Sequence, residues 1–111
     1  MAQTQIIEKS RWCEITREVV RPDTIRLIAK YTDAFNPSVY AVRVFELCGD
    51  VFRMRAKWHM PETKGERTLA AVELQPEAAA ELRGRIMSVS NVDEFKRLTW
   101  ELDERFLLQP S

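Results

Sequence analysis

The sequence predicts an α+β fold, in which an antiparallel sheet of about five strands carries two C-terminal helices on one face. Three observations support this prediction. Two β-rich runs meet at Gly49-Asp50, several other segments alternate between apolar and polar residues, and after Pro76 the apolar residues recur every three or four positions. We expect a single domain over residues 1–111, with residues 1–10 as a candidate flexible segment.

The central hairpin is expected to join residues 39–48 to residues 51–59, because Gly49 can take the positive φ that a two-residue turn requires. Such a turn fixes the register, so Leu47 should lie opposite Phe52 on an apolar side that enters the core. The other side should remain open. Its expected pairs are Glu46 with Arg53, Val44 with Arg55, Val42 with Lys57, and Tyr40 with His59.

Other strands are predicted on either side of this hairpin. Residues 24–32 alternate well, residues 12–20 have the composition of a strand, and a turn is expected between them at residues 21–23. After the hairpin, residues 61–66 should form a polar loop and residues 67–74 a fifth strand. These patterns do not determine the order of the strands in the sheet.

Two helices are predicted at the end of the chain. Pro76 suits the first position of the first helix, and Asn91 should cap the second, with Glu94 in the capping-box position. The expected buried residues are Ala78, Leu82, Ile86 and Val89 in the first helix, and Val92, Phe95, Leu98, Leu102 and Phe106 in the second. Trp100 and Leu107 lie off this stripe. We expect them to pack against the first helix, with a subunit interface as the alternative.

Composition limits the classes of function. Seventeen basic residues balance seventeen acidic ones, which argues against nucleic-acid binding by the whole surface but leaves room for a local basic patch. We find no apolar leader and no apolar stretch that could span a membrane. The two cysteines, Cys13 and Cys48, lie far apart in sequence, and we expect them to be free in a cytoplasmic protein.

The open side of the predicted sheet carries the candidate binding residues. Every second residue from Arg53 to His59 is basic or histidine, so these side chains should project from one side of a strand. The preceding strand should add Arg26 and Lys30. The candidate set is Arg26, Lys30, Tyr40, Val42, Val44, Arg53, Arg55, Lys57 and His59. The plainest interpretation of this side is a solvated surface.

Two kinds of partner fit these residues. Valines surrounded by charge favour a protein interface, including a homodimer formed face to face, unless residues 1–10 fold over them. Basic residues around an aromatic ring favour single-stranded nucleic acid. We therefore expect a non-enzymatic binding or adaptor protein that forms a homodimer, with a single-stranded nucleic-acid-binding protein as the alternative.

Catalysis is the least favoured function. His59 is the only histidine, and no Ser or Cys is paired with it by a recognisable spacing, so an enzyme or small-ligand carrier centred on His59 is the third hypothesis. One histidine and two separated cysteines cannot complete a zinc site, and no glycine-rich loop precedes a helix to hold a phosphate. We expect no cofactor and no metal.

Part of the chain resembles a family of nucleic-acid-binding proteins. Four strands followed by a helix, with a basic sheet face and a loop at Lys64-Gly65, make residues 40–86 similar to the single-strand-binding transcriptional coactivators and the purine-rich-element binders. The stretch between Gly65 and the helix is longer than in that family, the family's clustered lysines and aromatics are not matched, and a second helix is added. The resemblance implies binding of single-stranded nucleic acid.

Overall fold

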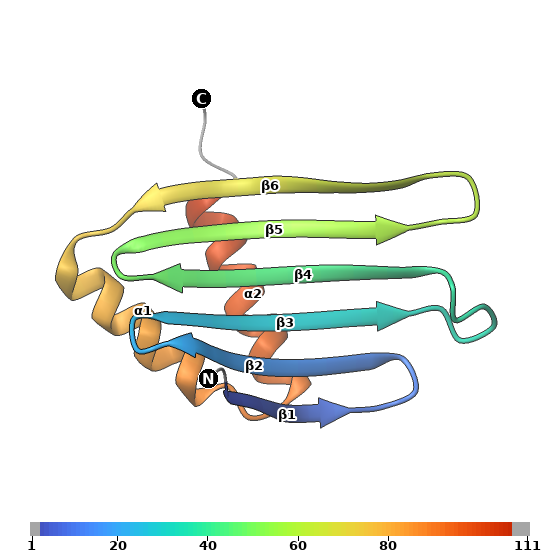
Figure 1. Ribbon diagram of the computed structural model, residues 1–111, viewed down its shortest axis with the longest axis horizontal. Coiled ribbons are helices and arrows are strands. Elements are labelled where there is room, and N and C mark those ends of the chain that lie inside the picture. The colour runs from blue at the N-terminus through green and yellow to red at the C-terminus, as the bar shows by residue number, and fades with distance from the viewer. Residues whose placement is uncertain (1–2, 108–111) are drawn as a thin grey trace.

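The computed structural model describes residues 3–107 (Figure 1). Within them, the elements in chain order are β1 (Gln3–Lys9), β2 (Cys13–Arg21), β3 (Thr24–Thr32), β4 (Tyr40–Cys48), β5 (Val51–His59), β6 (Lys64–Glu73), α1 (Pro76–Ser88) and α2 (Val92–Phe106). The strands form one antiparallel sheet in the order β1-β2-β3-β4-β5-β6, so that strands adjacent in sequence are also adjacent in space. The predicted α+β class is confirmed, with six strands in the described residues in place of about five.

The central hairpin has the predicted register. Gly49 has a φ of 58° in the turn between β4 and β5. The ladder places Leu47 opposite Phe52 and Glu46 opposite Arg53, as the two-residue turn requires. Leu47 and Phe52 are fully buried, so the apolar side of the hairpin enters the core as expected.

Strand β1 was not predicted by the sequence pattern. Residues 3–9 pair with β2 at the edge of the sheet, where the sequence suggests a flexible segment. The two isoleucines, Ile6 and Ile7, are adjacent rather than alternating, so the segment carries no strand signal of its own and depends on the ladder that β2 offers. Because residues 3–9 extend the sheet sideways, they do not fold over its open side.

Strand β6 starts earlier than predicted. The expected loop over residues 61–66 is shorter, because the ladder between β5 and β6 continues as far as the pair His59 and Lys64. A hydrogen bond from the Met60 backbone nitrogen to the Thr63 carbonyl, 2.7 Å long, closes the turn between them. The hairpin β5–β6 is therefore long enough to match its neighbours across the sheet.

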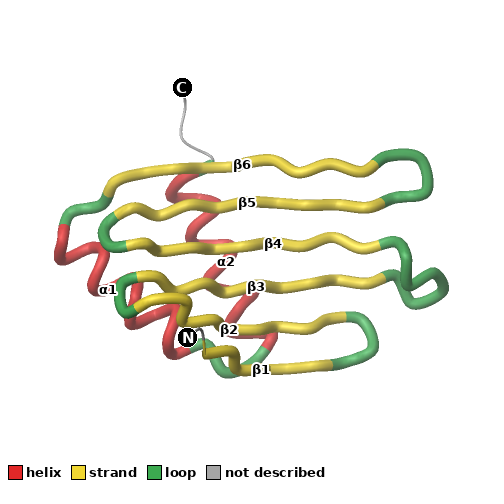
Figure 2. The backbone as a smooth tube through the Cα atoms, viewed as in Figure 1, coloured by secondary structure: helices red, strands yellow, loops and turns green. Residues whose placement is uncertain are grey.

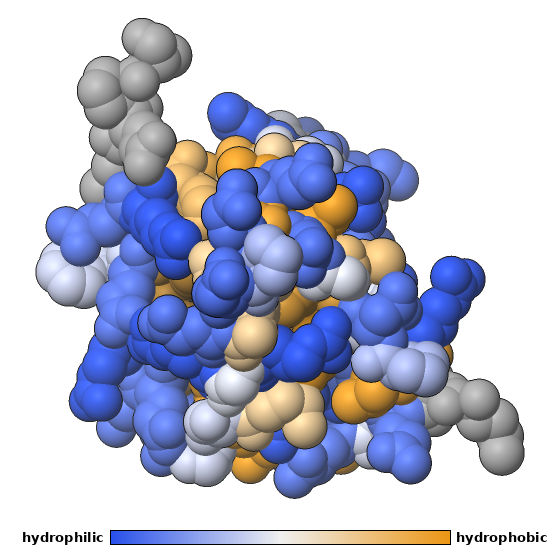
Figure 3. Space-filling view, turned by 90° about the vertical axis from the view of Figure 1, so that its left-hand side faces the viewer, coloured by the Kyte–Doolittle hydropathy of each residue, from blue (hydrophilic) through white to orange (hydrophobic). Residues whose placement is uncertain are grey.

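Both helices lie on one face of the sheet, behind the strands in Figure 1 and in red in Figure 2. The ring of Phe45 packs near the centre, with its centroid 6.2 Å from that of Phe52 and 5.6 Å from that of Phe95. The buried apolar residues between the layers are Ile15, Ile25, Leu27, Ala29, Phe45, Leu47, Phe52, Met54, Leu74, Ala79, Leu82, Ile86, Val89, Phe95, Leu98 and Leu102. At the end that carries α1, hydrophobic side chains are visible only between hydrophilic ones (Figure 3).

Two side chains cap the N-terminus of α2. The Asn91 side chain accepts a hydrogen bond of 2.9 Å from the Glu94 backbone nitrogen, which confirms the predicted cap. From β1, the Glu8 carboxylate accepts a hydrogen bond of 3.0 Å from the backbone nitrogen of Val92. The edge strand and the second helix are thus joined although 84 positions separate the two residues.

A buried arginine anchors the C-terminus of α1. Arg17 lies on the core side of β2 and is only 8% exposed. Its Nη1 donates hydrogen bonds to the carbonyl oxygens of Ile86, at 3.1 Å, and Val89, at 3.0 Å, and its Nη2 donates to the Gln5 side chain at 2.8 Å. The last carbonyls of a helix lack partners within it, and a cation there also complements the helix dipole.

Trp100 and Leu107 have different environments. Trp100 is 65% exposed, in place of the predicted packing against α1. Leu107 is partly buried and packs against the core. Leu98 and Leu102 direct their face of α2 toward the sheet, so Trp100, midway between them, points away. Leu107 follows the last residue of α2, Phe106, so the helical period does not determine its direction.

Candidate functional site

One face of the sheet is not covered by the helices and is turned toward the viewer in Figure 1. We call it the open face. Strands β2 to β5 contribute to it Glu14, Thr16, Glu18, Arg26, Ile28, Lys30, Tyr40, Val42, Val44, Glu46, Arg53, Arg55, Lys57 and His59. Residues that alternate with them, such as Ile15, Leu27 and Phe45, are fully buried on the helix side. The structure therefore brings every predicted binding residue of the sheet to one face.

A buried carboxylate gathers three arginines on the open face. Oε2 of Glu46 lies 2.6 Å from Nε of Arg26 and 3.6 Å from Nη2 of Arg55. Oε1 of Glu46 lies 3.5 Å from Nη1 of Arg53. Burial alone would raise the pKa of Glu46, but the hydrogen bond from Arg26 and the three guanidinium charges together hold that pKa below its ordinary value. The ionised carboxylate therefore neutralises part of the positive charge that the arginines bring to this face.

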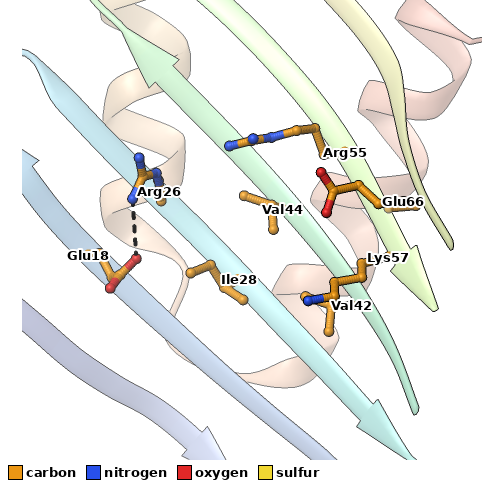
Figure 4. A pocket seen from close by; sticks show the side chains of 9 residues that line it. Glu18, Arg26, Ile28, Val42, Val44, Arg55, Lys57 and Glu66 are labelled. Carbon is orange, nitrogen blue, oxygen red and sulfur yellow. Dashed lines mark ion pairs between the residues drawn. The ribbon is translucent and has the colours of Figure 1, made fainter. Parts of the chain in front are cut away.

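Beside this cluster, three apolar side chains cross the middle of the open face. We call Ile28, Val42 and Val44 the apolar strip; all three are half-buried. They line a hollow of about 310 Å³. In Figure 4 the strip lies between the ion pair of Glu18 with Arg26 on one side and Arg55, Lys57 and Glu66 on the other. A ring of charged groups therefore surrounds a small apolar centre.

Tyr40 and His59 form a stacked pair at one end of the open face. Their ring centroids are 5.5 Å apart with an interplanar angle of 14°, and Nζ of Lys30 lies 4.7 Å from the Tyr40 centroid. Nδ1 of His59 lies 2.5 Å from the Ser38 carbonyl oxygen, so this nitrogen donates a hydrogen bond to it. The hollow beside His59 is about 490 Å³, and its lining in the described residues is Tyr40, Lys57, Trp58, His59, Lys64, Gly65 and Glu66.

The basic residues of the open face and Glu46 were predicted from the sequence, but the acidic residues of β2 were not. The hairpin register predicts that Glu46 faces Arg53, yet it does not show that Arg26 reaches the same carboxylate, because this contact depends on the pairing of β3 with β4. Glu14 and Glu18 were also missed. Their alternation with buried residues of β2 is the signal that could have placed them on this face.

Comparison with known proteins gives no match, whether to a protein-family model, to a curated protein or to a solved structure. Over residues 3–107, no helix has the length and apolar character needed to cross a membrane. In the same residues, no three His, Cys, Asp or Glu side chains come together as a metal site. Cys13 and Cys48 are both free and partly buried. The geometry of the open face is therefore the basis for a functional proposal.

Proposed function

We propose that this chain is a non-enzymatic binding protein that engages a protein partner through the open face. The observation that carries the proposal is the apolar strip, which lies uncovered by residues 3–107 in the middle of the sheet. An apolar centre with a charged rim is the usual composition of a protein interface. The helices already cover the other face of the sheet, so the strip is left for a partner.

The state of the arginines supports a protein partner over nucleic acid. Arg26, Arg53 and Arg55 all lie within 3.6 Å of the Glu46 carboxylate. Phosphate groups would have to compete with that carboxylate for each guanidinium, which weakens the electrostatic term on which nucleic-acid binding depends. A protein partner whose own charges are already paired can bind this face without displacing the arginines from Glu46.

The surroundings of His59 support a binding role over catalysis. A histidine that acts as a base for a nucleophile needs a hydroxyl or thiol within hydrogen-bond reach. In the described residues, the hollow next to His59 is lined by no Ser, Thr or Cys side chain that the imidazole could activate.

The test compares two variants that add the same charge to opposite sides of the molecule. Val44→Glu places a carboxylate in the apolar strip, and Met87→Glu places one on α1, where Met87 is 47% exposed. Any protein partner, including a second copy of the chain, should bind the wild type and Met87→Glu equally and Val44→Glu at least about tenfold more weakly. A protein partner that binds Val44→Glu as tightly as the wild type would contradict the proposal.

Single-stranded nucleic acid is the second candidate, favoured by the stacked pair. Tyr40 carries Lys30 over its ring, and the exposed Lys57 lies on the same face, so a base and a phosphate could be held together there. Anisotropy of labelled single-stranded and double-stranded oligonucleotides should decide. Binding that falls steeply with salt and weakens in Arg55→Ala would favour this candidate, and no binding at low salt would eliminate it.

A further inference from the structure

We infer that the partner is a second copy of this chain, bound face to face about a two-fold axis that runs parallel to the strands between β3 and β4. The inference rests on the proposed function, because it names the partner of the same open face. The inference is carried by the charges on the open face. They oppose unlike charges of a second copy when the axis runs parallel to the strands, and like charges when it runs across them.

The strand register arranges the open face in rows that run across the strands. From β2 to β5, the first row reads Glu18, Arg26, Glu46, Arg53. The second row reads Thr16, Ile28, Val44, Arg55. The third row reads Glu14, Lys30, Val42, Lys57, and β1 and β6 extend it with Lys9 and Glu66. The first row alternates in charge, the second is apolar at its centre, and the third has opposite charges at corresponding outer positions.

A two-fold axis parallel to the strands keeps each row opposite itself and exchanges β3 with β4 and β2 with β5. In the first row, Arg26 then lies over Glu46 of the second copy, and Glu18 lies over Arg53 of the second copy. Both contacts oppose unlike charges. Each also occurs twice in the dimer, as a two-fold interface requires.

In the other two rows, the apolar strip and the outer charges are complementary under the same rotation, while Lys30 lies over Val42 and Thr16 over Arg55 of the second copy. In the second row, Ile28 lies over Val44 of the second copy, so the apolar strips meet at the centre. In the third row, Glu14 lies over Lys57 of the second copy, and Lys9 lies over Glu66 of the second copy. Every outer contact of this row again joins opposite charges.

The other two-fold axis in the plane of the interface runs across the strands and exchanges the first row with the third. It would place Glu18 over Glu14 and Arg26 over Lys30 of the second copy. Arg53 would likewise lie over Lys57 of the second copy. Since like charges in contact across an interface oppose association, the charge pattern selects the axis parallel to the strands.

The size of the open face fits a stable dimer. Strands are spaced by about 4.8 Å and rise about 3.3 Å per residue, so six strands of up to about nine residues present roughly 800 Å². This is about the area that each partner contributes to a standard interface. Because the axis lies at the middle of the six strands, β1 of one copy covers β6 of the other and no strand is left over. Stacked sheets of this kind pack about 10 Å apart.

A charge exchange at Glu14 and Lys57 tests the inference. These two residues lie outside the Glu46 cluster, so the substitutions leave that cluster intact. Glu14→Lys alone and Lys57→Glu alone each put like charges together twice in a homodimer, and each should self-associate at least about tenfold more weakly than the wild type. An equal mixture of the two variants should recover association, because both contacts of the mixed dimer join unlike charges. A chain that carries both substitutions should also dimerise.

Analytical ultracentrifugation and energy transfer between labelled chains measure these outcomes, with circular dichroism to verify that each variant is folded. If the wild type dimerises through Val44 but neither the mixture nor the double variant recovers association, the inferred axis is wrong while the proposed function stands. A wild type that stays monomeric at millimolar concentration overturns the second copy as partner. A dimer that is insensitive to Val44→Glu overturns both.

Discussion

Replacing Arg17 by methionine should detach the C-terminus of α1 from the sheet. The substitution preserves most of the side-chain volume but removes the two hydrogen bonds that Nη1 donates to the Ile86 and Val89 carbonyls, at 3.1 and 3.0 Å, together with the bond from Nη2 to Gln5. A hydrogen bond from a charged group contributes about 1.5–3 kcal/mol. Because both bonds share one nitrogen, we expect a loss of about 2–4 kcal/mol in the free energy of unfolding. A domain of this size should then melt at least about 8 °C lower.

Urea unfolding followed by far-UV circular dichroism measures this loss, and Arg83→Met is the matched control. Arg83 lies on α1 and donates one exposed hydrogen bond of 2.8 Å to the Asp23 carbonyl, so its removal should cost less than about 1 kcal/mol. Arg17→Lys keeps the cation near the helix end but not the forked geometry of the guanidinium, so its loss of stability should lie between those of Arg17→Met and Arg83→Met. Equal losses for Arg17→Met and Arg83→Met would refute the assigned role of Arg17.

Three further predictions concern stability. The pKa of Glu46 is depressed in the fold, so the ionised carboxylate contributes to the free energy of unfolding at neutral pH, and this contribution is lost as the pH falls through that pKa. The wild type should therefore lose more stability in acid than Glu46→Gln. Urea titrations of both proteins over a range of pH measure this, and equal losses would contradict the prediction. In Gly65→Ala, the new Cβ would clash with the ring of Trp58, so the ring must move at a cost of about 1–3 kcal/mol. The movement should change the tryptophan emission, and unchanged emission and stability would contradict this prediction. In Gly84→Ala, the new Cβ would meet no atom within 4 Å beyond the neighbouring backbone of its own helix, so the substitution should stabilise α1 by about 0.5–1 kcal/mol. A lower melting temperature would count against the helix assignment.

Local signals in the sequence were sufficient for the hairpin and the helices. Gly49 determines the turn, the turn determines the register, and the register determines which residues of β4 and β5 share a face. The cap at Asn91 was predictable for the same reason, since its hydrogen bond spans only three positions. Features that depend on residues close together in the chain, such as this turn and this cap, can therefore be predicted from the sequence.

Features that depend on distant contacts were not predictable. Strand β1 has no alternation and forms because β2 has a free edge. Arg17 looks like an interruption of the apolar side of β2 until α1 is seen to end over it, some 70 positions later in the chain. The Glu46 cluster likewise needs the pairing of β3 with β4, which brings Arg26 to a carboxylate 20 positions away.

The order of strands in the sheet has a consequence for how the chain folds. Every strand pairs only with the strands next to it in sequence, so each hairpin closes a short loop at small entropic cost, and we expect fast folding for an antiparallel sheet of this size. The helix α2 is different, because it contacts β1 through Glu8 and β5 through the packing of Phe106 on Phe52. It can dock fully only after strands from both ends of the sheet are in place. Among the elements of residues 3–107, the last to be synthesised is therefore the one that joins the separate hairpins into a single cooperative unit.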